Sequence, residues 1–147
     1  WISDPRIAWI SIGVIGVWSV IGYNMVLFIS GLQEIPGDYY EAASIDGATG
    51  INQFFNITVP LLSPTTFFIV QTRLIGALTV FDLMFMVMDK TNVALEKVQS
   101  IVYLFYTYAF TNGNKGYGAT IVIVLVVFIM IVTFIMQKAE KTLVYHN

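Results

Sequence analysis

The stretch Ile7–Gln33, IAWISIGVIGVWSVIGYNMVLFISGLQ, contains no Asp, Glu, Lys or Arg, and neither does Gly116–Gln137, GYGATIVIVLVVFIMIVTFIMQ. A helix needs about 20 mainly apolar residues to cross the ~30 Å hydrocarbon layer of a membrane. Both stretches exceed that length. The sequence therefore predicts an integral membrane protein, with one transmembrane helix over 7–30 and another over 117–137.

The composition of the 147-residue chain indicates the same class. The chain is 57% hydrophobic and 11% charged, whereas a soluble domain is about 25% charged and about 45–50% apolar. Its net charge of −2 argues against nucleic acid as a partner. It has no Cys and a single His, which argues against a cysteine nucleophile, a Cys or His metal site and a Ser–His–Asp triad. We therefore expect no catalytic residue, no metal and no cofactor.

Two further apolar stretches complete the expected fold. The stretch 61–80 follows Pro60 and predicts a third transmembrane helix, in which Arg73 lies ~18 Å along the axis, near mid-membrane. The run 98–110 follows a polar loop, Asp89–Lys97, and is rich in Tyr and Phe. It is too short to span, so it predicts a re-entrant or interfacial helix. The expected fold is all-α, because lipid cannot satisfy free backbone groups.

The polar stretch 33–60, between the first two predicted spans, has clear local signals. It holds no Lys or Arg and four acidic residues, Glu34, Asp38, Glu41 and Asp46. Asp38 and Glu41 have the spacing of a capping box at a helix start, and Gly47 tolerates the positive φ that ends a helix. The stretch predicts two short helices, 39–45 and 51–57. Together these form a helix–turn–helix hairpin on the membrane surface.

This hairpin carries a spaced motif: Glu41-Ala42-Ala43, three residues, Gly47, nine residues, Ile57, one residue, Val59-Pro60. The motif resembles the EAA loop of ABC importer permeases, whose pattern is E-A-A, three, G, nine, I-x-L-P. Every spacing matches, and the single departure is Val59 in place of Leu. Flanking residues are similar too, and Phe81-Asp82 and Tyr117-Gly118 resemble the sugar and glycerol-phosphate branch. The resemblance covers essentially the whole chain.

The resemblance implies a type I importer permease with a core of roughly six helices. The chain begins with Trp1 rather than Met, and we expect it to be the C-terminal part, with the last three spans. In this family the loop docks into a cleft of the ATPase subunit and transmits its closure to the membrane helices. The residues assigned to ATPase coupling are Glu41, Ala42, Ala43, Gly47, Ile57 and Pro60. The alternative is that Glu41 only caps its own helix and the alanines only favour helicity.

The implied partners are ATPase (nucleotide-binding) subunits, a second permease subunit, an extracytoplasmic solute-binding protein and membrane lipid. The implied location is the plasma membrane of a bacterium or archaeon, with the loop and the C-terminus in the cytoplasm. Lys138 and Lys141 agree with that orientation, because cytoplasmic ends carry more positive charge. Four other basic residues then fall outside: Arg6, Lys90, Lys97 and Lys115. Family members often carry basic residues between the Gly and the Ile, and this chain has none.

Polar and aromatic side chains within or beside the apolar stretches are candidates for a substrate path: Asn24, Gln71, Arg73, Asp82 and Tyr106. An ionisable residue in a membrane is a functional hypothesis because its burial is costly. Structural alternatives are a hydrogen bond between helices for Asn24, an ion pair for Arg73 and an interfacial belt for the aromatic residues. On one continuous helix Arg73 and Asp82 would lie about 180° apart and could not easily pair.

Three classes of function fit these features. The first is a permease for ATP-driven import of a carbohydrate or related solute, and the second is a channel or ion-coupled secondary transporter that uses Arg73 and Asp82. The third is a structural membrane subunit. The hairpin favours the first, because only an ATP-driven permease needs a docking element for an ATPase. The chain lacks the Gly-x-x-x-x-Gly-Lys-[Ser/Thr] phosphate loop, so we expect it not to be an enzyme and the ATPase to be a separate chain.

Overall fold

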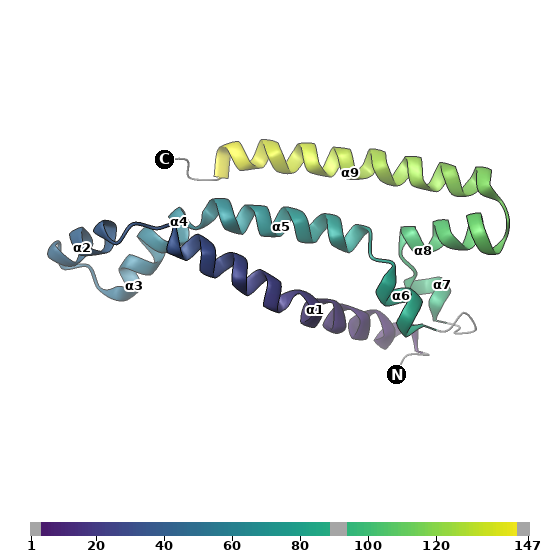
Figure 1. The fold of residues 1–147 in the computed structure, drawn as a ribbon, viewed down its shortest axis with the longest axis horizontal. Coiled ribbons are helices and arrows are strands. Elements are labelled where there is room, and N and C mark those ends of the chain that lie inside the picture. Colours follow the sequence, from purple (N-terminus) through teal and green to yellow (C-terminus); the bar gives the residue numbers. More distant parts are fainter. Residues whose placement is uncertain (1–3, 89–93, 144–147) are drawn as a thin grey trace. The chain divides into compact units, whose positions relative to one another are not determined.

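The computed structural model describes residues 4–88 and 94–143, and the regular structure in these residues is helical throughout, as predicted (Figure 1). The contacts divide the chain into two units. We call residues 1–20 and 73–133 the aromatic unit and residues 21–72 and 134–147 the hairpin unit. Three helices contribute residues to both units: α1, α5 and α9.

Helices α1 (Pro5–Gln33) and α9 (Lys115–Leu143) are 29 residues long each. Their segments Arg6–Gln33 and Lys115–Lys141 have mean hydropathies of 2.0 and 3.2, and both are long and apolar enough to cross a membrane. The predicted spans 7–30 and 117–137 lie inside these helices. Most apolar side chains on them are exposed to solvent in the chain alone, which is the surface that lipid or neighbouring membrane helices cover.

Helix α5 (Ser63–Leu78) has 16 residues and is shorter than the predicted span 61–80. At ~24 Å it does not by itself reach across the hydrocarbon layer. It reaches the length of a span only together with the preceding helical segment Gly50–Leu61, from which it is bent by 58°. The bend lies at Leu62, next to Ser63-Pro64, where proline removes a backbone donor from the helical ladder.

The hairpin between α1 and α5 has two arms. The first arm is α2 (Asp38–Ile45), and the second is α3 (Gly50–Gln53), continued by the π-helical turn η1 (Phe54–Thr58) and by α4 (Val59–Leu61). Gly47 has a φ of 78° in the turn between the arms. The turn therefore uses the positive φ predicted for this glycine.

The predicted capping box at the start of the first arm is wrong. The N-cap of α2 is Gly37, whose backbone is already helical, and no side chain of the described residues caps this end. A capping side chain requires an extended backbone at the N-cap, and that condition is met instead at Thr49. Its hydroxyl accepts a hydrogen bond from the backbone N–H of Asn52 at 3.5 Å, at the start of the second arm.

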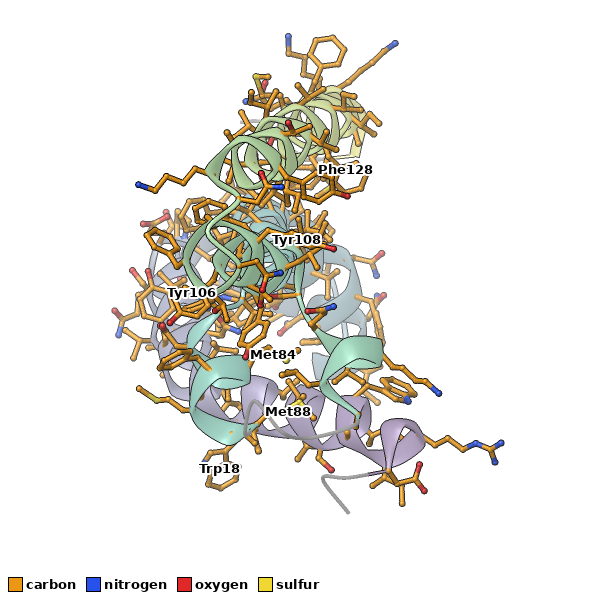
Figure 2. All side chains as sticks on the ribbon, turned by 90° about the vertical axis from the view of Figure 1, so that its right-hand side faces the viewer. Trp18, Met84, Met88, Tyr106, Tyr108 and Phe128 are labelled. Carbon is orange, nitrogen blue, oxygen red and sulfur yellow. The ribbon has the colours of Figure 1, made fainter. Side chains whose placement is uncertain are left out.

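The aromatic unit contains α6 (Asp82–Val87), α7 (Leu95–Val98), α8 (Ile101–Tyr106) and the π-helical turn η2 (Thr107–Thr111). Its buried cluster consists of Ala8, Ile12, Met84, Met88, Ala94, Leu95 and Tyr103. Figure 2 shows Met84 and Met88 pointing into the space between α6, α7 and the start of α1, whereas Trp18 points away. Apolar burial therefore holds this unit together.

The predicted aromatic helix 98–110 begins later than expected. Ser100 has an extended backbone, and its hydroxyl accepts a hydrogen bond from the backbone N–H of Tyr103 at 3.1 Å, so it caps α8. The preceding helix α7 lies partly in the predicted loop Asp89–Lys97, of which residues 89–93 lie outside the described residues. Residues 1–3 also lie outside the described residues.

The turn from η2 into α9 is tightly packed. Gly113 has a φ of 69°, and Asn114 accepts a hydrogen bond from the backbone N–H of Tyr117 at 3.1 Å. A Cβ atom added to Gly118 would lie 2.8 Å from the Cβ of Ala109. The close approach of η2 and α9 therefore depends on the absence of a side chain at position 118.

Candidate functional site: the hairpin between α1 and α5

The two arms of the hairpin lie side by side (Figure 1) and are joined by the side chain of Gln53. Its Nε2 atom donates to the Ser44 hydroxyl at 2.9 Å, to the Ala48 carbonyl at 3.4 Å and to the Tyr40 carbonyl at 3.5 Å. These acceptors lie on the first arm and in the turn. One amide on the second arm therefore contacts the first arm at two points and the turn at a third.

A second link joins the arms closer to the membrane helices. The hydroxyl groups of Tyr40 and Thr58 lie 2.9 Å apart and hydrogen-bond to each other. Thr58 is buried within η1, so its hydroxyl is shielded from competing water. Tyr40 takes part in both links, through its carbonyl and through its phenol.

The motif residues occupy different positions on this hairpin. Glu41 and Ala42 are exposed on α2, and Ala43 is half-buried. Gly47 lies in the exposed turn, and an added Cβ there would meet no atom of the described residues within 4 Å. The turn therefore requires glycine at position 47 because of the positive φ, and not because a larger side chain would lack space. Ile57 and Pro60, in the second arm, are half-buried.

The outer surface of the hairpin combines negative charge with apolar side chains. Its acidic residues Glu34, Asp38, Glu41 and Asp46 are all exposed. Ile45 is 87% exposed at the end of α2, and Ile51 is exposed at the start of the second arm. A shallow hollow on the first arm is lined by Pro36, Asp38, Tyr39 and Ala42. Such a surface suits a partner that offers basic groups and apolar contacts.

The residues predicted for a substrate path are divided between the two units. Asn24 and Gln71 belong to the hairpin unit, whereas Arg73, Asp82 and Tyr106 belong to the aromatic unit. Asn24 is half-buried in α1, and among the described residues its Oδ1 atom has no hydrogen-bond partner. Gln71 and Arg73 are two positions apart on α5, so they lie about 160° apart around the helix, on nearly opposite sides.

The structure does not place Arg73 and Asp82 on one continuous helix, which was the condition for their predicted separation. Helix α5 ends at Leu78, and Asp82 is the first residue of α6. The separation of about 180° around a helix therefore does not apply to this pair. Arg73 is half-buried, whereas Asp82 is exposed.

Tyr106 belongs to an aromatic cluster that also contains Phe81, Phe85, Tyr103 and Phe110. Its ring centroid lies 5.3 Å from that of Phe81, 5.6 Å from Phe85 and 5.7 Å from Phe110. Tyr106, which Figure 2 labels, is the last residue of α8. Tyr103 is buried in the core, so in this structure its ring packs against protein. The exposed rings of the cluster are Phe85 and Phe110.

The sequence-based prediction did not include Ser44, Gln53 and Thr58 among the functional residues. Ser44 and Gln53 are nine positions apart, and Tyr40 and Thr58 are eighteen positions apart. Because the turn at Gly47 separates the two arms, periodicity along one continuous helix or strand does not predict which of these side chains meet. The only available signal was the predicted hairpin itself, which implies that some side chains of the two arms meet.

Comparison with known proteins agrees with the motif. A family model described as "Binding-protein-dependent transport system inner membrane component" matches residues 1–144. The probable ABC transporter permease protein YurN of Bacillus subtilis is 34% identical over 143 residues, which are 97% of this chain and 48% of that protein. The sn-glycerol-3-phosphate transport system permease protein UgpA of Agrobacterium fabrum is 36% identical over 144 residues, which are 97% of this chain and 48% of that protein.

A third relative is the arabinooligosaccharides transport system permease protein AraP of Bacillus subtilis. It is 30% identical over 138 residues, which are 94% of this chain and 44% of that protein. The chain thus spans about half the length of these curated relatives. No solved structure matches it significantly. The family match over nearly the whole chain, together with its apolar helices, shows that the protein belongs to the inner membrane components of binding-protein-dependent transport systems, the ABC transporter permeases.

Proposed function

We propose that this chain is part of a permease subunit that forms half of a translocation path for ATP-driven import. The hairpin with its two arms couples that path to a separate ATPase subunit. The observation that carries the proposal is the exposed position of Glu41 and Ala42 on a hairpin whose turn requires glycine at position 47. A surface hairpin that exposes the motif residues, and whose arms are joined by hydrogen bonds, can transmit the movement of a bound partner.

The solute that we propose is a carbohydrate or a related compound such as a glycerol phosphate. The names of two relatives support this class, since UgpA is a permease for sn-glycerol-3-phosphate and AraP is one for arabinooligosaccharides. The candidate path residues are the five named above, of which Tyr106 has a ring that could stack against a sugar face. A second permease subunit and an extracytoplasmic solute-binding protein complete the proposed transporter.

We further propose that the hairpin and the C-terminus lie in the cytoplasm. The charge of the hairpin supports a basic partner surface, because residues 33–60 carry four acidic side chains and no Lys or Arg. Complementary charge orients a partner and speeds its association. We therefore expect ATPase binding to weaken as the salt concentration rises, since exposed charge pairs are screened beyond about 10 Å at 0.1 M salt.

A cross-linking experiment in the full-length protein tests the proposal. A photo-activated cross-linker attached to Ile45→Cys, on the exposed end of the first arm, should capture the ATPase subunit in native membranes. Val124→Cys, an exposed apolar position in the middle of α9, is the control and should capture lipid or membrane helices. Capture by Ile45→Cys should be lost with Gly47→Pro, because proline cannot adopt the positive φ of the turn.

The opposite result would contradict the proposed coupling role of the hairpin. If Ile45→Cys captured only lipid or the protein's own helices in an intact transporter, the hairpin would be a packing element. In that case a channel or ion-coupled transporter that uses Arg73 and Asp82 would become the better explanation. Transport that survives ATP depletion and follows an ion gradient would then be the expected behaviour.

A further inference from the structure

We infer that Gln53 is a positioning residue for energy coupling: its amide locks the two arms of the hairpin so that they move as one body. The inference rests on the proposed function of the hairpin. The observation behind it is the set of three contacts from Gln53 Nε2 to Ser44, Ala48 and Tyr40, at 2.9, 3.4 and 3.5 Å. Gln53 lies outside the fixed positions of the motif, so its role comes from the geometry of the hairpin.

The hydrogen-bond directions in this network are determined by its chemistry. The Ser44 hydroxyl donates its only proton to the Tyr40 carbonyl at 2.7 Å, so its oxygen is left to accept from Gln53. The other two partners of Gln53 are carbonyl oxygens, which can only accept. The amide nitrogen, which carries two N–H donors, must therefore face the first arm. A side chain of the same size without N–H donors cannot replace it.

The hairpin has little else to keep its arms in register. None of the described residues of α2 or α3 is buried, so no apolar core lies between these two helices. The turn includes Gly47, whose open surroundings place no steric limit on it. The other side-chain hydrogen bond between the arms in the described residues, between Tyr40 and Thr58, lies at the opposite end of the second arm from the turn. Without Gln53, no side-chain hydrogen bond among the described residues would join α2 to α3.

This arrangement explains how a push on α2 could reach the membrane helices. The exposed motif residues Glu41 and Ala42 lie on the first arm, whereas the second arm continues through α4 to the bend before α5. A force applied to the first arm must cross to the second arm to move α5. The hydrogen bonds of Gln53 to Tyr40 and Ser44 connect the second arm to the part of the first arm that carries the exposed motif residues. Loosening it should let the ATPase bind and hydrolyse ATP with less solute moved.

The test uses the full-length transporter reconstituted in vesicles, with solute import and ATP hydrolysis measured on the same sample. Gln53→Glu keeps the size of the side chain but replaces two N–H donors by a second acceptor. We expect the solute imported per ATP to fall by up to about tenfold, as loss of a net hydrogen bond allows. Gln137→Glu, which adds the same charge at an exposed position of α9 outside the hairpin, is the matched control and should leave the ratio unchanged.

Gln53→Lys provides a rescue, because an ammonium group offers three donors to the same acceptors. It should restore most of the import per ATP, whereas a purely steric role would make Glu the better replacement. The inference is overturned if Gln53→Glu behaves like the unaltered protein, or if Gln53→Lys is no better than Gln53→Glu. Co-purification of the ATPase shows in each variant that the complex is assembled.

A second measurement compares one variant before and after chemical cross-linking, so it does not depend on how well a single-substitution variant folds. In the double variant Ser44→Cys/Gln53→Cys, a short bifunctional thiol reagent that joins the two positions should raise the import per ATP of the same sample. A reagent that modifies both thiols without joining them should not raise it, and if joining has no effect the inference fails. Capture of the ATPase by Ile45→Cys tests the proposed function separately, so either result for Gln53 can be interpreted.

Discussion

The aromatic unit and the hairpin are held together by different interactions. In the aromatic unit, Met84, Met88 and Tyr103 pack with four other buried residues into an apolar cluster. In the hairpin, the arms α2 and α3 bury no described residue and are joined by the hydrogen bonds of Gln53 and Tyr40. Apolar burial stabilises in proportion to area, whereas hydrogen bonds fix direction. The hairpin, which buries little apolar surface between α2 and α3, is therefore held in shape mainly by interactions of the second kind.

The largest effect that this comparison predicts is in the apolar cluster. Met88 is 2% exposed, so Met88→Ala should lower the free energy of unfolding by ~2–5 kcal/mol through lost burial and a cavity. Met86, two positions earlier, is 83% exposed, and Met86→Ala is the matched control with an effect near zero. Thermal unfolding of the full-length protein in detergent measures both. Equal shifts would mean that the cluster is not a core.

A smaller effect is expected where η2 meets α9. Gly118→Ala would place a methyl group 2.8 Å from the Cβ of Ala109 and 3.2 Å from its Cα, so the two segments must separate at a cost of ~1–3 kcal/mol. Gly116→Ala is the control, since its Cβ would be 3.9 Å from Asn114. Faster hydrogen exchange of the η2 amides in Gly118→Ala alone is the expected result. Exchange that does not change would contradict the close packing.

In the hairpin, Gly47→Ala should destabilise the turn by ~1–2 kcal/mol, because only glycine adopts a positive φ without strain. Gly50→Ala is the control, since Gly50 has a helical backbone and equally open surroundings. Limited proteolysis of the full-length protein in membranes should cut the hairpin faster in Gly47→Ala only. Identical cleavage of the two variants would show that the turn does not depend on its glycine.

The smallest effect is expected at the hydrogen bond between Tyr40 and Thr58, which joins the arms close to the membrane helices. Tyr40→Phe removes one hydrogen bond to Thr58 and should cost ~0.5–1.5 kcal/mol of local stability. Tyr39→Phe, on the exposed side of the same helix, should cost less. Hydrogen exchange of the backbone amides of η1 reports this difference. A larger effect from Tyr39→Phe would argue that its phenol contributes to the hollow that Asp38 and Ala42 also line.

Much of the helical architecture could be predicted from short stretches of sequence. The helices α1 and α9 enclose the spans predicted from the absence of charge, because this property needs no knowledge of neighbouring elements. The positive φ of Gly47 followed equally from a local backbone preference. Predictions that depended on how segments join were less successful. The capping box at Asp38 was wrong, and the bend that precedes α5, the helix within the predicted span 61–80, was not predicted.

The sequence by itself determined that this protein is a helical membrane protein of the ABC permease family, because apolar length and motif spacing depend only on the order of residues along the chain. Only the tertiary structure decided that Gln53, rather than the capping pair Asp38 and Glu41, stabilises the hairpin. The physical reason is that its partners on α2 and in the turn come within hydrogen-bond distance only after Gly47 has folded α3 back against α2. Contacts of this kind form only in the folded hairpin, so the periodicity of a single helix or strand does not predict them.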